Sequence, residues 1–323
     1  MTLLVRDEED VLDEHIAYHL SAGVSFVIAT DHRSRDRTPE ILESYERRGV
    51  LRVLREEGEF GQQSAWQSRM ARLAATEHDA EWVIHSDADE FWWPRGPSLP
   101  EALEAVDRRY GVVHGLVRNF VPRRDDQGSW ADRMTLRFAS PAPVNDPATP
   151  FRPVVKIAHR GDPDVVVGGG GAHQVFGVRG EVLRAWHPLE VLHVPFRSRT
   201  QSATKYRKAW TGWKGNPRGD LARARQGSDE GRDAVVWDRV ALDDADCERG
   251  LLDGSLVSDT RLRDALRARA SDRRYEPSPQ GRAELARHAG EVAVFQEAEL
   301  VRFARWTDEL ACRVRALEGA GRR

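Results

Sequence analysis

Residues 81–93 read EWVIHSDADEFWW, an apolar run that ends in two aspartates spaced one residue apart. Side chains of an extended strand alternate between its two faces, so Asp87 and Asp89 are expected to point the same way. Two adjacent carboxylates at the end of a buried strand are electrostatically costly unless a cation or a polar ligand lies between them. The D-x-D pattern therefore indicates a metal site. The alternative for an isolated D-x-D is an acidic turn that follows a strand.

The residues before this stretch alternate between apolar strand patterns and helical patterns. The strand patterns lie at 1–5, 24–29, 50–54 and 82–85, and the helical patterns lie at 11–20, 39–45 and 62–76. The second helix has Pro39 in its first turn, with Thr38 or Asp36 as its N-cap. Strands and helices that alternate at this pace predict parallel strands joined by helical crossovers, and hence an α/β sheet.

Polar residues follow several of the expected strands. In α/β sheets, ligands bind at the carboxyl ends of the strands. Arg6, Asp31 and the D-x-D pair each occupy a strand end of this kind. We therefore expect one cleft to contain all of them.

Several ordered motifs resemble those of family 2 glycosyltransferases. They are RDEED at 6–10, YH at 18–19, TDHRSRDRTPEIL at 30–42, WQSRMAR at 66–72 and DADEF at 87–91. The match is closest to the bacterial branch in which Glu-Phe follows the D-x-D. The later stretch EVLHVPFRS at 190–198 is similar to the His-x-Pro-x-Arg segment of the same branch. The resemblance covers roughly residues 1–210, and the order of the motifs makes it specific.

This resemblance implies the GT-A fold, a Rossmann-like, mostly parallel central sheet flanked by helices. It also implies that a divalent cation at the D-x-D holds a nucleoside diphosphate sugar. The implied metal ligands are Asp87, Asp89 and His193. Oxygen ligands favour Mg²⁺ or Mn²⁺, and a histidine ligand shifts the preference toward Mn²⁺. For His193 to share an ion with Asp89, its ring must lie within about 8 Å of that carboxylate.

Further residues are implied to bind the nucleotide sugar. Asp31 is expected to contact the nucleotide base. Arg197 and Lys205 are expected to neutralise the diphosphate, the arginine in bidentate fashion, and solvated surface charges are the alternative for both. The full set implied to bind the nucleotide sugar is Arg6, Glu8, Asp31, Arg69, Asp87, Arg197 and Lys205.

The general base is not assigned by the sequence. Enzymes of this class usually carry it on a Glu-Asp pair, and no downstream residues match that pair. His173 follows the run of glycines at 168–171, where family members often have Gly-x-His, and is the tentative candidate. A histidine that only satisfies a local carbonyl is the alternative. Inversion at the anomeric carbon is implied by the resemblance alone.

Composition is compatible with an enzyme of this kind. The chain has 323 residues, 40% of them hydrophobic, which is enough to bury a full core. A net charge of -3 gives no bulk attraction to nucleic acid. Two cysteines, Cys247 and Cys312, are too few for a zinc site or a disulfide framework. No signal peptide is recognisable, and no apolar run approaches the roughly 18 to 20 residues of a membrane span, so a cytoplasmic location is expected.

The character of the sequence changes after residue 212. Residues 1–212 are expected to form the GT-A catalytic domain, and residues 213–323 a mostly helical appendage. Within the appendage, the Arg/Gly/Asp-rich residues 218–232 predict a mobile segment, and residues 259–274 predict an exposed helix. The amphipathic pattern at 283–317 predicts a helix or helix pair that packs on the catalytic domain or on a second subunit, which makes a homo-oligomer an option.

The sequence thus predicts a metal-dependent glycosyltransferase that uses a nucleoside diphosphate sugar and an unknown acceptor, such as a saccharide, a natural product or a peptide. Two alternatives stay open. A nucleotidyltransferase would usually have a glycine-rich basic loop after its first strand, and residues 6–10 contain no glycine. A non-catalytic nucleotide-sugar-binding protein of the same fold is the other, and the presence of Asp87, Asp89 and His193 together counts against it.

Overall fold

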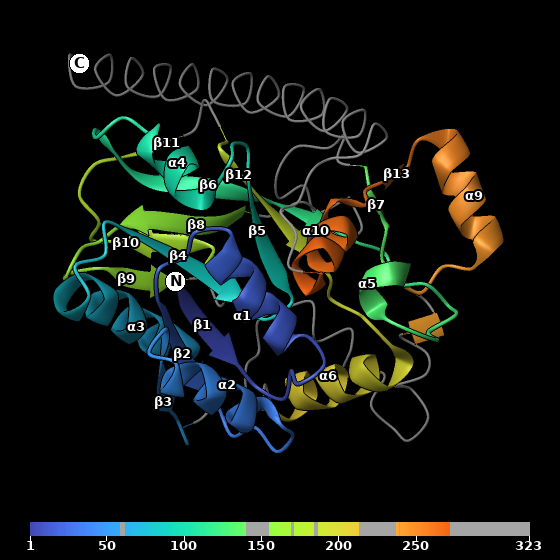
Figure 1. Ribbon diagram of the computed structural model, residues 1–323, viewed down its shortest axis with the longest axis horizontal. Coiled ribbons are helices and arrows are strands. Elements are labelled where there is room, and N and C mark those ends of the chain that lie inside the picture. The colour runs from blue at the N-terminus through green and yellow to red at the C-terminus, as the bar shows by residue number, and fades with distance from the viewer. Residues whose placement is uncertain are drawn as a thin grey trace, which may run out of the picture.

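The computed structural model describes residues 1–58, 62–139, 155–168, 171–183, 187–212, 237–238 and 240–271, and the side chains of 206–212 are not described. Its first half alternates strands and helices (Figure 1). In chain order these are β1 (Thr2–Val5), α1 (Leu12–Ser21), β2 (Val27–Asp31), α2 (Thr38–Arg47), β3 (Leu51–Arg55), α3 (Gln63–Glu77), β4 (Trp82–Asp87), β5 (Glu90–Pro94), α4 (Leu99–Glu104) and β6 (Tyr110–Asn119).

The second half is made of shorter elements. They are α5 (Trp130–Arg133), β7 (Leu136–Phe138), β8 (Val155–Arg160), β9 (Val166–Gly168), β10 (Gln174–Phe176), β11 (Glu181–Leu183), β12 (Leu189–His193), α6 (Arg199–Gly212), α9 (Asp244–Asp253), β13 (Leu256–Ser258) and α10 (Arg261–Ala270). The N-cap of α2 is Arg37, which makes no side-chain cap hydrogen bond, so the expected cap at Thr38 or Asp36 is wrong. Two other helix ends have regular caps. Ser98 caps α4 by accepting the Glu101 N–H, and Gly254 ends α9 in the left-handed conformation, at φ 78°.

One central sheet organises these elements, and its strand order is β3-β2-β1-β4-β8-β6-β12-β5, with β11 added beside β6. The strands β3, β2, β1 and β4 are parallel neighbours, as helical crossovers between them require. From β4 onward the sheet is mixed, because β8 runs antiparallel to both β4 and β6, and β5 runs antiparallel to β12. The predicted α/β architecture with a mostly parallel sheet is confirmed.

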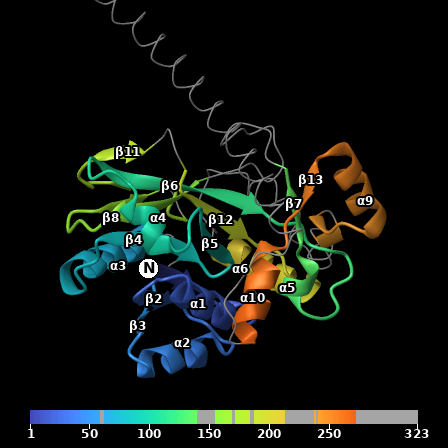
Figure 2. The ribbon, with the colours of Figure 1, turned by 45° about the horizontal axis from the view of Figure 1, so that its top comes forward.

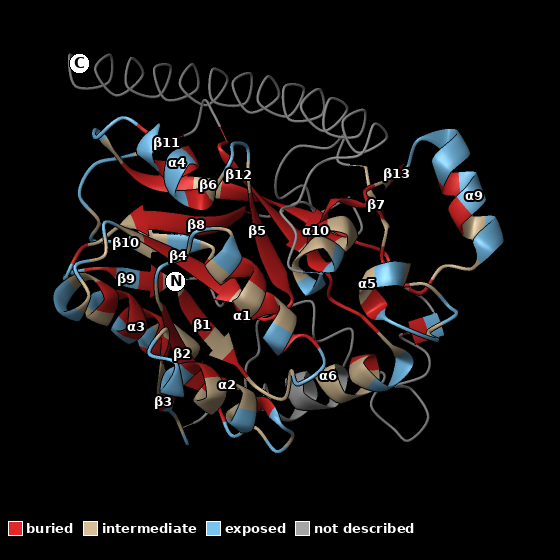
Figure 3. Cartoon of the chain, in the orientation of Figure 1, coloured by how far each residue is buried: buried red, intermediate tan, exposed pale blue. Residues whose placement is uncertain are grey.

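Helices cover both faces of the sheet, so most of its strand residues are buried (Figure 3). On one face, α1, α2 and α10 share a core cluster with β1, β2 and β5. On the other face, α3 packs with β9 against β1, β2 and β4. Because both faces of the inner strands are covered, their sequences are continuously apolar rather than alternating.

Two stretches of the first half contain elements that are not among the strands and helices expected before the D-x-D. Residues 90–94 form a strand of their own, β5, which pairs with β12 at one end of the strand order. Residues 99–104 form the short helix α4, and Tyr110 already belongs to β6. In both stretches the neighbouring strand comes from elsewhere in the chain, which a local pattern does not reveal.

Residues 256–270 pack into the core of the N-terminal unit. Strand β13 pairs with β7, and α10 lies beside α1 (Figure 2). The expected exposed helix at 259–274 is therefore wrong in its exposure, because Leu262, Ala265 and Leu266 are buried in the core cluster of α1. Arg261 is buried as well, between Glu190 and Asp259. Residues 256–270 lie beyond the boundary expected at residue 212, yet they pack against elements that precede it.

Two expectations lie outside the described residues, namely the mobile segment at 218–232 and the amphipathic helices at 283–317. Within the residues that are described, no helix combines the length and the apolar character that crossing a membrane requires.

Candidate functional site

The carboxyl ends of the strands bring predicted site residues from distant parts of the chain to one edge of the sheet. Asp31 and Asp87, the last residues of β2 and β4, pair in register with the end of β1. His193, the last residue of β12, pairs with Glu90 of β5 and with Asn119 of β6. The sheet topology therefore places the D-x-D between two polar strand ends.

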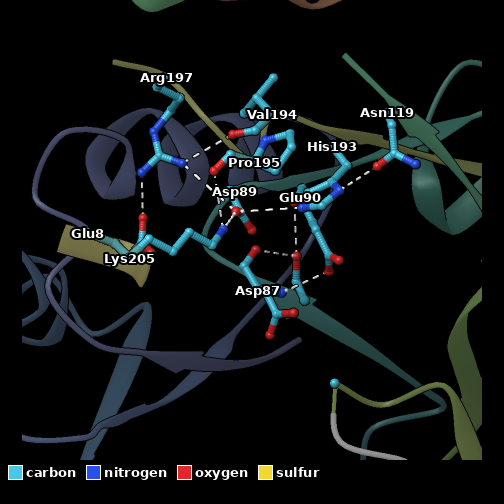
Figure 4. Close-up of polar contacts among 12 residues, drawn as sticks. Glu8, Asp87, Asp89, Glu90, Asn119, His193, Val194, Pro195, Arg197 and Lys205 are labelled. Carbon is cyan, nitrogen blue, oxygen red and sulfur yellow. Dashed lines mark hydrogen bonds and ion pairs between the residues drawn. The ribbon is translucent and has the colours of Figure 1, made fainter. Parts of the chain in front are cut away.

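Asp89 lies in the turn between β4 and β5, and its side chain is buried. Its Oδ2 contacts Lys205 Nζ and lies 3.5 Å from His193 Nε2 and 3.9 Å from Arg197 Nη1 (Figure 4). Its backbone carbonyl accepts the Val194 N–H at 2.9 Å, which holds this turn against the end of β12. Burial raises the pKa of Asp89, but its cationic neighbours, Lys205 above all, outweigh burial and hold that pKa well below its ordinary value. Asp89 is therefore an ionised carboxylate.

His193 has its ring oriented by Asn119. The distance from His193 Nδ1 to Asn119 Oδ1 is 2.7 Å, and because the amide oxygen only accepts, Nδ1 donates. In the neutral ring Nε2 then carries the lone pair, and it faces Asp89 Oδ2 at 3.5 Å. A lone pair and a carboxylate oxygen repel each other unless a cation or a proton lies between them. A hydrogen bond from the other ring nitrogen, like the one from His193 Nδ1 to Asn119, is what orients metal-binding histidines. The expected proximity of His193 to Asp89 is confirmed, and its role as a metal ligand stays a prediction.

Arg197 is buried at 1% side-chain exposure, so it is not a solvated surface charge. Its guanidinium lies 2.5 Å from a Glu8 oxygen and 2.8 Å from an Asp10 oxygen, and it donates to the Val194 carbonyl at 3.2 Å. Burial lowers the pKa of Arg197, but Glu8 and Asp10 raise it by more than burial lowers it, so the pKa lies above its ordinary value. Arg197 thereby joins the loop after β1 to the loop after β12, and its predicted contact with a phosphate stays a prediction.

Asp87 is held by a residue that the sequence reasoning missed. Lys156 Nζ, from β8, lies 2.8 Å from Asp87 Oδ2 and 2.9 Å from Glu90 Oε2. The ammonium also donates to the Gly171 carbonyl at 2.6 Å. Burial lowers the pKa of Lys156, but the two carboxylates outweigh burial and raise that pKa above its ordinary value. The first aspartate of the D-x-D is therefore paired with a permanent cation.

The other predicted donor-binding residues contact groups outside this cluster. Asp31 Oδ1 accepts the Ser34 N–H at 3.2 Å within the loop after β2. Arg6 follows β1, and its Nε lies 3.9 Å from the Asp7 carboxylate. Arg69 lies on α3 with a side chain that is 57% exposed, and it pairs with Glu56 at 2.8 Å. Arg69 is thus directed to the end of β3 rather than to the D-x-D.

His173 is half-buried beside the same cluster. Its Nδ1 lies 2.7 Å from the Val155 carbonyl, so Nδ1 donates and Nε2 keeps the lone pair. Burial, and then Lys156, lower the pKa of His173 below its ordinary value. The expected alternative, a histidine that satisfies a local carbonyl, describes one of its two nitrogens. The other nitrogen, Nε2, carries the lone pair that a general base needs.

Four residues of the cluster were not found from the sequence, namely Asp10, Glu90, Asn119 and Lys156. Two of them carried a readable signal. Lys156 is one of only four lysines among 49 basic residues, and it interrupts an apolar strand pattern. Asn119 likewise ends the apolar run of β6. Glu90 directly follows the D-x-D, and nothing in its local sequence indicates that it is buried.

The charge of the cluster bears on whether a metal ion fits. Five carboxylates face three permanent cations, which leaves two surplus negative charges when all are ionised; the carboxylates are those of Glu8, Asp10, Asp87, Asp89 and Glu90, and the cations are Lys156, Arg197 and Lys205. Asp10 and Asp87 are 38% and 39% exposed, so water offsets part of this surplus, and a divalent cation would balance the rest. Burial raises the pKa of Glu8 and of Glu90 above the ordinary value.

The donor atoms suit such an ion in part. Across the described residues, no three His, Cys, Asp or Glu side chains surround a common point. Asp89 and His193 supply one oxygen and one nitrogen, and Mg²⁺ or Mn²⁺ commonly takes its other ligands from substrate phosphates and water. Lys205 Nζ contacts the same Asp89 oxygen, so an ion at Asp89 requires this ammonium to move. Asp89 and His193 are the residues that fit a divalent cation.

Comparison with known proteins agrees with the sequence motifs. Residues 8–139 match the model of the family described as Glycosyl transferase family 2. This confirms the predicted family resemblance over that segment. No curated protein sequence matches the chain.

Solved structures give weaker likenesses. S. aureus TarS has 14% identity over 66% of this chain and 39% of that chain, with a TM-score of 0.34. TarS 1–349 in complex with UDP-GlcNAc has 14% identity over 69% of this chain and 68% of that chain, with a TM-score of 0.35. Glucosyl-3-phosphoglycerate synthase from Mycobacterium tuberculosis has 15% identity over 49% of this chain and 55% of that chain, with a TM-score of 0.25. This chain therefore spans well under half of the longer TarS chain, and superpositions this loose transfer no ligand, residue role or activity.

Proposed function

Since residues 8–139 are a glycosyl transferase family 2 segment, we propose that the protein is a metal-dependent glycosyltransferase that moves a sugar from a nucleoside diphosphate sugar to an acceptor. The observation that carries this proposal is the partly buried cluster around the D-x-D, with two surplus negative charges and His193 Nε2 directed at Asp89. Such a cluster suits a divalent cation that binds a diphosphate. The acceptor is a saccharide, a natural product or a peptide.

Each residue of the cluster has a distinct part in donor binding. Asp89 and His193 hold the cation, which, when bound, stabilises the negative charge that develops on the diphosphate leaving group. Lys205, released from Asp89, contacts the diphosphate. Arg197 holds Glu8 and Asp10 in place around the site, because its guanidinium is already committed to those two carboxylates.

Two residues outside the cluster complete the proposal. Asp31, at the end of β2, binds the nucleotide base. His173 takes the proton of the acceptor nucleophile through Nε2, because its Nδ1 donates to the Val155 carbonyl. Attack from the face opposite the leaving diphosphate inverts the anomeric carbon. The cytoplasmic location and a homo-oligomer remain predictions.

The proposal is tested by ligand binding and then by turnover. Thermal-shift measurements with nucleoside diphosphates and nucleotide sugars, each with Mn²⁺, Mg²⁺ or a chelator, are expected to show stabilisation that needs both the nucleotide and the cation. Asp89→Asn is expected to lose this stabilisation. Arg52→Met, which removes an exposed ion pair with Glu77, is the matched control and is expected to keep it.

A turnover assay that identifies the released product separates the two alternatives. A nucleotidyltransferase would release pyrophosphate from a nucleoside triphosphate, whereas the proposed enzyme releases a nucleoside diphosphate from a nucleotide sugar. A non-catalytic binding protein would bind the nucleotide sugar and release nothing, even with saccharide acceptors present. Absence of any cation-dependent nucleotide binding by the wild-type protein would overturn the proposal.

A further inference from the structure

Lys156 is a buried cation with a complete set of hydrogen-bond partners. Its side chain is 1% exposed, in the middle of the sheet between β4 and β6. Its three ammonium protons meet three acceptors, Asp87 Oδ2 at 2.8 Å, Glu90 Oε2 at 2.9 Å and the Gly171 carbonyl at 2.6 Å. An ammonium in such a place is costly unless it is fully paired, and this one is. It has no proton left to give to a substrate.

The contacts of Lys156 fix the first aspartate of the D-x-D. Glu90 Oε2 accepts the Asp87 N–H at 3.0 Å and also receives Lys156 Nζ, so the backbone and the carboxylate of Asp87 are held by one linked pair. Only Oδ2 of Asp87 is used in this way. The Asp87 side chain is 39% exposed, so the remainder of its carboxylate is open to a ligand.

Lys156 and its neighbour in β8, Val155, also anchor the segment that carries His173. The Lys156 ammonium binds the carbonyl of Gly171, and the carbonyl of Val155 accepts His173 Nδ1–H at 2.7 Å. Residues 171–173 are therefore tied to β8 at two adjacent points. Asp87 is tied to the same strand through Lys156.

We propose that Lys156 is a positioning residue for donor binding, which turns the free oxygen of Asp87 toward the nucleotide sugar and keeps residues 171–173 beside it. This inference rests on the proposed function, because it names the ligand that Asp87 meets. Lys156 acts through Asp87 and Gly171 and touches no substrate. The proposal gives a reason for a buried lysine at a position where an apolar residue would suit the strand.

The test separates positioning from charge balance. Lys156→Met removes the ammonium and leaves two adjacent buried carboxylates, so it is expected to lower the melting temperature as well as nucleotide affinity. The double variant Lys156→Met/Glu90→Gln removes one charge of each sign, and the glutamine oxygen still accepts the Asp87 N–H. We expect it to regain most of the thermal stability. Calorimetric affinity for a nucleoside diphosphate with Mn²⁺ is expected to stay about 10- to 100-fold weaker than in the wild type.

Each outcome decides one question. If the double variant regains wild-type nucleotide affinity together with its stability, Lys156 serves charge balance alone and the positioning role is wrong. If it regains stability and not affinity, the role is supported. Arg52→Met, with its exposed ion pair removed, is the control and should bind as the wild type does. If the wild type itself binds no nucleoside diphosphate, the proposed function fails first, and the positioning role falls with it.

Discussion

Two groups of buried ionisable side chains contact β4 and β5, and the protein accommodates them in opposite ways. The cluster around Asp87 and Asp89 keeps its charges and pairs them with lysine and arginine. The histidines behind it are kept neutral because burial lowers their pKa below the ordinary value. Paired charges leave a surplus that a ligand can balance, whereas neutral groups need no partner of opposite charge. The first group is therefore suited to binding and the second to holding strands and helices together.

The hydrogen bonds of the first histidine pair, which joins α1 to β4 and β5, define its tautomers. His15 Nε2 lies 3.0 Å from Ser86 Oγ, and because Ser86 donates its own proton to the Glu90 carbonyl, His15 Nε2 is the donor. His19 Nδ1 donates to the His15 carbonyl, and His19 Nε2 accepts the Trp92 N–H at 3.0 Å. Both nitrogens of His19 are thus satisfied in a neutral ring, whereas His15 is bonded through Nε2 and its buried Nδ1 has no hydrogen-bond partner among the described residues.

The second histidine pair crosses the sheet from β1 to β8. His159 Nδ1 donates to the Arg160 carbonyl at 2.7 Å, so its Nε2 must accept from His85 Nε2 at 3.0 Å. His85 Nδ1 then accepts from the Thr2 hydroxyl at 2.7 Å. Neighbouring residues of a strand point to opposite faces, so this pair and the one at Ser86 lie on opposite sides of β4. With these tautomers, every hydrogen bond in the row from Thr2 to the Arg160 carbonyl has one donor and one acceptor.

The largest expected effect is on the charged cluster. Asp89→Ala removes the carboxylate that faces Lys205 and His193, so Mn²⁺-dependent binding of a nucleoside diphosphate is expected to weaken by about 100-fold or more in calorimetry. The histidine pairs make no contact with Asp89 in the described structure, so circular dichroism should show a folded protein. Retention of tight binding would mean that Asp89 is a structural carboxylate, and the charged cluster would then not differ in role from the neutral histidines.

Acid is expected to act on the histidines. Burial lowers the pKa of His15 and of His159 from 6.5 to about 4, so the folded state binds fewer protons than the unfolded state between those values. Neither group affects the pH dependence well above pH 6.5, and the free energy of unfolding falls as the pH drops from 6.5 toward 4. The loss is up to about 3 kcal/mol for each histidine.

His15→Gln tests this within one background. The glutamine amide replaces the Nε2 donor to Ser86 and does not titrate, so urea unfolding at about pH 7.5 and about pH 5 should show a smaller loss than in the wild type. Glu8 and Glu90 act in the opposite direction, because burial raises their pKa, and both proteins share them. An equal loss in the two proteins would mean that His15 is not held neutral.

Asn119→Ala is expected to have an intermediate effect. Without the oxygen that fixes the Nδ1 proton, the His193 ring is free to rotate or to change tautomer, so Mn²⁺ affinity should fall by about tenfold. Mg²⁺ depends less on a nitrogen ligand, so its affinity should change less, and the preference for Mn²⁺ should narrow. An unchanged ratio of the two affinities would remove His193 from the ion.

The smallest effect is expected at Asp31, which lies outside the charged cluster. Asp31→Ala removes one hydrogen bond to the nucleotide base, so nucleoside diphosphate affinity should fall by about fivefold, or about 1 kcal/mol. Affinity for the metal alone should not change, because Asp31 bonds to Ser34 in its own loop and to none of the cluster. Normal nucleotide binding by this variant would make Asp31 a structural residue.

Sequence patterns were informative where the structure is local. The strands and helices from β1 to β4 follow periodicity and caps within about 15 residues each, and their parallel order follows from the crossovers between them. The D-x-D and Asp31 were found because each ends a strand of that series. The proximity of His193 was expected only through a family resemblance, and the structure supplies it through the pairing of β12 with β5 and β6.

What the sequence alone determined about this protein is the α/β order of its first half, its family resemblance and the carboxylates at the strand ends. Only the tertiary structure decided how those carboxylates are balanced. Lys156 reaches Asp87 across 69 positions of the chain, and Arg197 reaches Glu8 across 189. A charged residue in a sequence carries no mark of its burial or of its partner, because the free energy that holds it depends on groups brought beside it by distant strands.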